Sequence, residues 1–174
     1  MNVQSAATID PPATMAPPPV AMPANDLAPI VGAALSAVLP QRFPFMMLDQ
    51  ITAWETGAWA RGVKCVAAHE PLLTDPGARF WPEPYVIESL GQLAIALFNL
   101  DAGDGAAPTV LLGSVAGVTY HKRIPLGARL DLEVRIERFF GDSFVCSGRC
   151  DIDGVQHLEM EALTCKILNH GTTS

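Results

Sequence analysis

The stretch from residue 84 to residue 100 constrains the fold most strongly, because it reads as a helix buried on nearly every side. It contains no proline after its first residue, and its apolar residues recur at helical spacing. These residues are Ile87, Leu90, Ala94, Leu97 and Phe98. The other central residues are mostly apolar or small, so the predicted helix lacks an ordinary polar face. A single helix of this kind needs a sheet curled around it.

The sequence on both sides of this helix predicts strands. The clearest case is 130–137, where apolar and charged residues alternate with period two, as in a strand with one solvent-exposed face. Strands are also predicted over 109–122, 143–152 and 155–168, and two more precede the helix, one running towards Trp54 and one over 58–68. A loop is expected over 69–82, which contains several prolines. The predicted fold class is therefore α+β, with an antiparallel sheet of five to six strands wrapped around one long buried helix.

The first part of the chain differs in composition. Residues 1–26 are rich in proline and alanine and carry two charges, which predicts a disordered tail ahead of one domain over 27–170. The tail has neither the positive start nor the continuous apolar middle of a secretory signal. Asp26 is expected to cap a short helix that runs through Val38 and ends before Pro40.

Composition excludes several classes of function. The formal net charge is −7 and the pI is about 4.9, so no pervasive positive field exists to hold a nucleic-acid backbone. No apolar run approaches the roughly 18 residues of a membrane span. The four cysteines form no CxxC pair, so we expect no metal site and no disulfide scaffold, and they favour a reducing compartment. We also expect a cytoplasmic protein without a cofactor.

Two polar residues stand inside the apolar helix. Glu88 and Gln92 are four residues apart and therefore point the same way. A buried glutamate is rare unless it is paired, and burial favours its neutral form, which suits a general acid. A structural pairing of Glu88 with a neighbouring donor is the alternative.

Four motifs, in order, resemble the 3-hydroxyacyl-acyl-carrier-protein dehydratases of the hot-dog fold. LPQRFPFMMLD at 39–49 resembles the family's LPHRYPFLLVD, and EPLL at 70–73 resembles its NEPFF loop. IESLGQ at 87–92 resembles the helix motif IEAMAQ, and 120–127 matches a basic strand followed by a proline-glycine turn. The resemblance covers three quarters of the chain and implies a hot-dog domain. It also implies a homodimer or a heterodimer with a paralogue, with the site between two subunits.

The catalytic histidine of that family has no counterpart here. It stands fourteen residues before the catalytic glutamate, in a loop that reads HFPGRPVMPG. Counting back from Glu88 places Thr74 at the histidine and Glu83, followed by Pro84, at the glycine whose amide would face the thioester. The chain therefore resembles a divergent branch of the family, found beside polyene and polyketide pathways.

Several residues are candidates to replace the histidine. His69 lies in the same loop, Asp75 is adjacent to the lost position, and His121 lies on a predicted strand of unknown orientation. Thr74 alone cannot deprotonate carbon at neutral pH. Each also has a structural interpretation, and Asp75 in particular is a common turn former. Glu88 acting alone on one face is a further alternative.

The remaining candidates concern binding. The free amides of Glu83 and Tyr85 at the helix N-terminus are expected to hold the thioester oxygen. Gln92 is expected to position Glu88, while Phe80, Trp81 and Tyr85 either line an acyl tunnel or belong to the core. Four basic residues are candidates for docking an acidic carrier protein, with ordinary solvated charges as the alternative. These are Lys122 and Arg123, together with Arg42 and Arg79.

Three functions remain open from the sequence. The first is dehydration of 3-hydroxyacyl thioesters of acyl carrier protein or coenzyme A, with Glu88 as acid, in fatty-acid, polyene or polyketide synthesis. The second is a non-catalytic subunit that pairs with an active paralogue. The third is a thioesterase in which Glu88 activates water or attacks the carbonyl. We expect no nucleic-acid or membrane partner for any of them.

Overall fold

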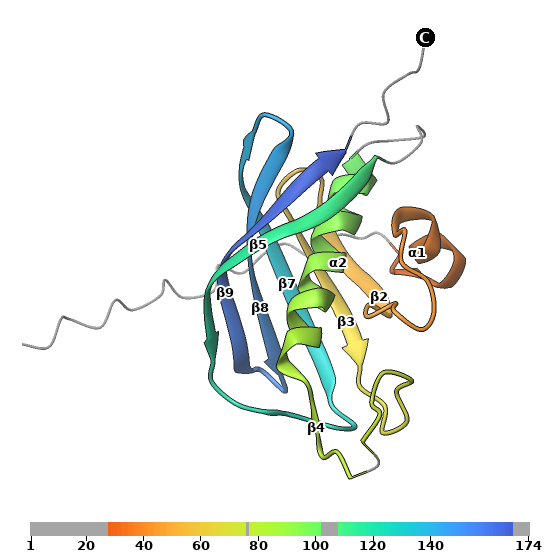
Figure 1. Ribbon diagram of the computed structural model, residues 1–174. Coiled ribbons are helices and arrows are strands. Elements are labelled where there is room, and N and C mark those ends of the chain that lie inside the picture. Colours follow the sequence, from red (N-terminus) through yellow and green to blue (C-terminus); the bar gives the residue numbers. More distant parts are fainter. Residues whose placement is uncertain (1–27, 76, 102–107, 169–174) are drawn as a thin grey trace, which may run out of the picture.

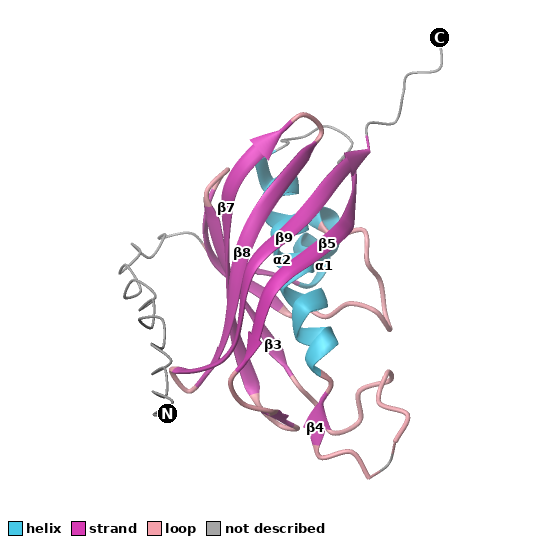
Figure 2. Ribbon diagram, turned by 60° about the vertical axis from the view of Figure 1, so that its left-hand side comes forward, coloured by secondary structure: helices cyan, strands magenta, loops and turns pink. Residues whose placement is uncertain are grey.

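A long helix, α2 (Glu83–Asp101), forms the centre of the molecule in the computed structural model, which describes residues 28–75, 77–101 and 108–168. The helix predicted over 84–100 is thus confirmed to within one residue at each end. From Val86 to Leu97 most of its residues are fully buried, and Phe98 stacks on Phe144 with ring centroids 5.3 Å apart. The absence of a polar face is explained by the sheet that curls around this helix (Figures 1 and 2).

The sheet has seven strands, and every neighbouring pair is antiparallel. Their order is β1 (Ile30–Val31), β2 (Gln50–Glu55), β3 (Trp59–Cys65), β7 (Arg129–Phe140), β8 (Ser143–Ile152), β9 (Val155–Leu168) and β5 (Thr109–Tyr120). The predicted α+β class and the predicted wrapping of an antiparallel sheet around one long helix are both confirmed. The bounds of β8 and β9 are those predicted from the sequence.

Three short strands were not predicted. One is β1, which gives the main sheet seven strands where the sequence predicted five to six. β4 (Phe80–Trp81) and β6 (Ile124–Pro125) form a separate two-stranded sheet beside the start of α2. β4 falls within the predicted loop over 69–82. Two-residue strands carry no periodic signal, so alternation of apolar residues cannot reveal them.

The first helix begins later than predicted. α1 spans Gly32–Val38, and the residues before it pair with β2 as the short strand β1. Val31 occupies the N-cap position without a side-chain cap, so the prediction of a helix starting at residue 27 was wrong. Asp26, the expected cap, and the tail over 1–26 lie outside the described residues.

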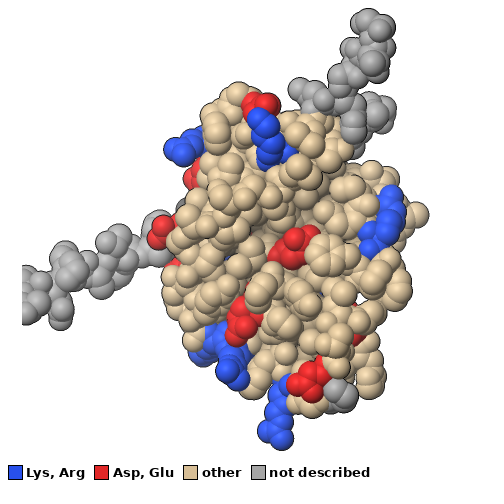
Figure 3. Space-filling view, viewed as in Figure 1, with Lys and Arg blue, Asp and Glu red and all other residues tan. Residues whose placement is uncertain are grey.

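The core lies between α2 and the concave face of the sheet. Leu90, Leu93 and Leu97 of α2 are buried together with Leu132 and Val134 of β7. Neither helix of the described ranges is long and apolar enough to cross a membrane. The face on which α2 lies is mostly uncharged, with charged side chains scattered over it (Figure 3).

Candidate functional site

The carboxyl group of Glu88 is held in place by the side chain of Gln92. Gln92 Nε2 donates a hydrogen bond of 2.9 Å to Glu88 Oε1, as the four-residue spacing on one helix face predicts. Gln92 is fully buried, whereas Glu88 is half-buried. No ion pair involves Glu88 in the described part of the chain, so its carboxyl is neither locked to a cation nor free in bulk solvent.

Gln92 also ties α2 to the chain ahead of β2. Its Oε1 accepts a hydrogen bond of 2.8 Å from the amide of Met47, and its Nε2 donates to the carbonyl of Phe45 at 2.9 Å. The motif at 39–49 therefore contacts the IESLGQ motif directly. All the polar atoms of the Gln92 side chain are used, which fixes the position of the donor to Glu88.

Burial raises the pKa of the Glu88 carboxyl above its ordinary value, and the hydrogen bond from Gln92 opposes this only in part. A carboxyl in this condition binds a proton more tightly than a solvated one. It is therefore better suited than a solvated carboxyl to exchange a proton with a substrate.

The raised pKa predicts how stability depends on pH. The folded state holds the Glu88 proton more tightly than the unfolded state. The stabilisation of the fold by this tighter proton binding is complete below the unfolded pKa of about 4.3, and it is lost as pH rises through the raised pKa of the folded state. Glu88→Gln has no such loss. We expect the free energy of unfolding of the variant, relative to wild type, to be larger at pH 8 than at pH 4, measured by urea denaturation at one protein concentration. An equal difference at both pH values would contradict this.

Three predicted site residues meet in the loop before β4. His69, Thr74 and Asp75 are exposed and line a cavity of about 470 Å³, together with Glu70 and Leu126 among others. The side chain of Asp75 accepts a hydrogen bond of 2.8 Å from the amide of Gly77, which is the turn-forming contact weighed as its structural interpretation. None of the three makes a hydrogen bond or ion pair with Glu88.

This loop is anchored by a lysine that sequence reasoning missed. Lys64 is 5% exposed, and its Nζ lies 2.8 Å from Glu70 Oε1 and 3.4 Å from Asp49 Oδ1. The ammonium is also 6.0 Å from the ring centre of Trp81. The period-two pattern of β3 gives no sign that Lys64 points inward, so only the unusual position of a lysine among apolar residues could have identified it.

The other described histidines point elsewhere. His121 Nε2 lies 3.3 Å from Glu159 Oε1, and Glu159 stands between Leu158 and Met160, whose side chains enter the core. His121 therefore lies on the face of the sheet opposite α2. His157 Nδ1 lies 3.1 Å from the carbonyl oxygen of Arg123.

Aromatic residues surround the start of α2. Trp81 is buried and meets Tyr85 edge to face, with ring centroids 5.1 Å apart. Phe80 is 41% exposed and carries the Arg123 guanidinium 5.0 Å from its ring centre. The prediction of a free Tyr85 amide was wrong, because this amide donates to the Pro82 carbonyl within the first helical turn. Of the two amides predicted to hold the thioester oxygen, that of Glu83 therefore stays a candidate.

The basic candidates differ in their surroundings. Lys122 and Arg123 are exposed and lie between β5 and β6. Ile124, the next residue, pairs with Trp81 just ahead of α2, which places both basic residues close to the start of this helix. Arg42 donates to the carbonyls of Leu39 and Gln41 in its own loop.

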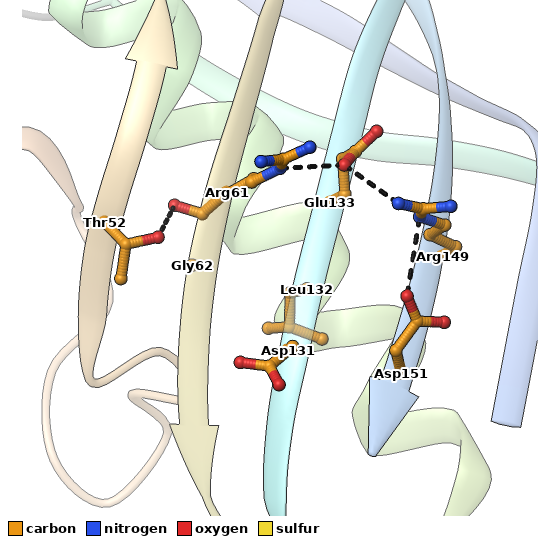
Figure 4. Close-up of a pocket in the computed structure, with 8 residues that line it drawn as sticks. All are labelled: Thr52, Arg61, Gly62, Asp131, Leu132, Glu133, Arg149 and Asp151. Carbon is orange, nitrogen blue, oxygen red and sulfur yellow. Dashed lines mark hydrogen bonds and ion pairs between the residues drawn. The ribbon is translucent and has the colours of Figure 1, made fainter. Parts of the chain in front are cut away.

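A second cavity, of about 250 Å³, lies on the outer face of the sheet (Figure 4). It contains an ionic network in which Arg61 and Arg149 both bind Glu133, at 2.9 and 3.2 Å. Burial alone would raise the Glu133 pKa, but the Arg61 hydrogen bond and the neighbouring arginine charges outweigh it, so the net pKa lies below the ordinary value. Asp151 extends the network to Arg149 at 3.6 Å. Since Glu133 is 7% exposed and paired, we interpret this network as structural.

The fold and the half-buried carboxyl on the central helix define a hot-dog protein. Two solved structures of this class are similar to the chain. A chain of the dehydratase heterocomplex ApeI:P from Xenorhabdus doucetiae matches with a TM-score of 0.69 at 16% identity, over 78% of this chain and 91% of the other. A hot-dog-like protein from Thermanaerovibrio acidaminovorans matches with a TM-score of 0.55 at 18% identity, over 67% and 85%.

Relatives found by sequence indicate the family more specifically than the structural matches do. The 3-hydroxyacyl-acyl-carrier-protein dehydratase FabZ of Thermomicrobium roseum is 31% identical over 132 residues, 74% of this chain and 87% of its own. FabZ of Cereibacter sphaeroides is 29% identical over 131 residues, 73% of this chain and 84% of its own. No family model matches the chain. The chain belongs to the family of the FabZ dehydratases.

Proposed function

We propose that this protein eliminates water from 3-hydroxyacyl thioesters of an acyl carrier protein and yields 2-enoyl thioesters. One observation carries the proposal: a half-buried carboxyl with a raised pKa stands on the central helix of a FabZ-family fold, positioned by Gln92. The residues 87–92 that hold both groups also carry the helix motif of the family.

The chemistry requires three groups. A base removes the α-proton, an acid protonates the departing hydroxyl, and donors hold the oxygen of the thioester as it gains charge. Glu88 supplies one proton-transfer group, and the amide of Glu83 at the N-terminus of α2 is proposed as the donor. Phe80, which is 41% exposed, is proposed to contact the acyl chain near this end of the helix, whereas Trp81 belongs to the core.

The test is turnover of a 3-hydroxybutyryl thioester on acyl carrier protein, with the carrier-bound product identified by mass spectrometry. The 2-enoyl product supports dehydration. Release of free thiol without enoyl product, followed with a thiol dye, would assign the thioesterase activity instead. No product of either kind would reject catalysis by the protein alone.

Carrier docking is proposed at Lys122 and Arg123. Both are exposed beside the start of α2, and Arg123 is held over Phe80. An acidic carrier needs a local basic surface on a protein of net charge −7, because the overall charges repel. Arg79, also exposed, lies next to β4 and adds to this surface.

We propose a dimer formed through β5. This strand is at the end of the sheet, pairs with β9 alone, and is exposed over most of its 12 residues, including Leu111 and Val115. A long strand edge with apolar side chains is a template for pairing with a strand of another chain. The partner is a second copy or a paralogue.

The dimer predicts the effect of a charge on β5. We expect Val115→Lys to raise the dimer dissociation constant at least about tenfold, since an apolar contact is replaced by a desolvated ammonium in each subunit. Light scattering after size-exclusion chromatography measures the change. Val155→Lys is the matched control, because Val155 is 43% exposed, as Val115 is 42% exposed, but lies at the β8–β9 turn. Equal masses for the two variants across a dilution series would contradict the proposed edge.

A second candidate function is that of a non-catalytic subunit beside an active paralogue. It is favoured by Thr74, because counting back fourteen residues from Glu88 places Thr74 at the position of the family's catalytic histidine. Such a protein gains activity only when a histidine-containing paralogue is added, and the two co-purify. A homodimeric preparation that forms the enoyl product counts against it.

A further inference from the structure

Tyr85 lies on the same side of α2 as Glu88 and Gln92. The three residues are spaced by three and four positions, which places them in one row along the helix. Residues three apart on a helix have Cβ atoms about 5–6 Å apart, so Tyr85 and Glu88 are surface neighbours. This row is polar, whereas most other residues of α2 from Val86 to Leu97 are buried and apolar.

The backbone amide, the backbone carbonyl and the ring of Tyr85 all have partners within the fold, whereas its hydroxyl group has none among the described residues. The amide donates to the carbonyl of Pro82 at 3.0 Å, and the carbonyl accepts from Ser89 Oγ at 2.8 Å. The ring packs edge to face on Trp81. No residue in the described ranges forms a hydrogen bond with the phenolic oxygen. The hydroxyl is therefore open to water or to a ligand, and packing alone would be satisfied by phenylalanine.

Glu88, like Tyr85, has one polar atom without a partner in the described part of the chain. Its Oε1 accepts from Gln92, and its second oxygen has no hydrogen-bond partner among the residues that the structure describes. Two groups that can exchange a proton therefore lie on one side of α2, each with one atom available to a ligand. His69, His121 and His157 do not bond to either of them.

We propose that Tyr85 is a second catalytic residue of the dehydration, the proton donor to the departing hydroxyl, while Glu88 takes the α-proton. The proposal rests on the proposed function. In the step, the Glu88 carboxylate removes the proton from the α-carbon, and the electrons of that C–H bond form the new C=C bond. The bond from the β-carbon to oxygen breaks, and the leaving oxygen takes the phenolic proton to give water.

The division of roles follows from ordinary acidities. A phenol carries a proton that it can donate, whereas an ionised carboxyl can only accept one. Burial strengthens Glu88 as a base by raising its pKa. Transfer of the Glu88 proton to the phenolate restores both groups, so the cycle needs no external acid.

The decisive experiment compares two leaving groups on Tyr85→Phe. The substrates are 3-hydroxybutyryl and 3-fluorobutyryl thioesters of acyl carrier protein. Fluoride departs without protonation, whereas hydroxide does not, so we expect Tyr85→Phe to lose at least about a hundredfold in kcat for water elimination. The same variant is expected to eliminate fluoride at nearly the wild-type rate. Glu88→Gln is expected to lose both reactions, because both require removal of the α-proton.

The chain contains one other tyrosine, which provides the matched control. Tyr120 is 48% exposed at the end of β5, and we expect Tyr120→Phe to keep the wild-type rates on both substrates. A Tyr85→Phe variant that slows both substrates equally would show a structural role and overturn the proposal. Unchanged water elimination would overturn it as well. A wild-type protein without product from either substrate would reject the proposed function itself, so the two failures are distinguishable.

Discussion

We expect the Glu88→Gln variant to lose dehydration by about 10²- to 10⁴-fold in kcat, the range typical for removal of a proton-transfer group. Glutamine has the size of glutamate, and its carbonyl oxygen can still accept the hydrogen bond from Gln92. The contacts of α2 are therefore kept, while the ability to take a proton from carbon is removed. The rate of enoyl product formation, measured by mass spectrometry, reports the loss.

A matched control separates this effect from a general change in charge. Glu161 is exposed on β9, and Glu161→Gln is expected to turn over at the wild-type rate. Circular dichroism and thermal unfolding establish that both variants are folded. A folded Glu88→Gln variant with the wild-type rate would show that this carboxyl does not transfer the proton.

The fold was predictable where the chain has a strong period or clear turn residues. The bounds of α2 follow from a proline-free apolar run at helical spacing, and β8 and β9 from alternating residues between short turns. The start of α1 was not predictable in this way. Ile30 and Val31 fit a helical stripe, yet they pair with β2, so a tertiary contact overrides the local pattern.

The candidate site was predictable only in its local part. The pairing of Glu88 with Gln92 follows from a spacing of four on one helix. The contacts of Gln92 with Phe45 and Met47 join residues about 45 positions apart, and no local pattern encodes them. The open hydroxyl of Tyr85 could not be predicted either, because it depends on what every other polar group in the fold has bonded to.

These long-range contacts also explain how position and chemistry are coupled. The motif at 39–49 does not supply a side chain to Glu88; it supplies the backbone groups that fix Gln92. Gln92 in turn fixes the carboxyl. The resemblance of both motifs to the dehydratase family therefore reflects one connected unit, in which the first segment positions the residue that positions the acid-base group.

We expect Gln92→Leu to destabilise the protein by about 2–4 kcal/mol, which corresponds to a melting temperature lower by roughly 5–15 °C for a chain of this size. Leucine fills the space but leaves the buried Met47 amide without an acceptor, while the Phe45 carbonyl, nearer the surface, loses less because water can reach it. Loss of the donor to Glu88 also removes the interaction that lowers the pKa of that carboxyl, so the pKa rises further.

Denaturant unfolding at one protein concentration measures the change, since a dimer makes stability depend on concentration. Gln156→Leu is the control: the Gln156 amide bonds only the half-exposed Glu159 carboxyl, and we expect a change within about 0.5 kcal/mol. Equal stabilities of the two variants would mean that Gln92 does not hold the chain ahead of β2 against α2.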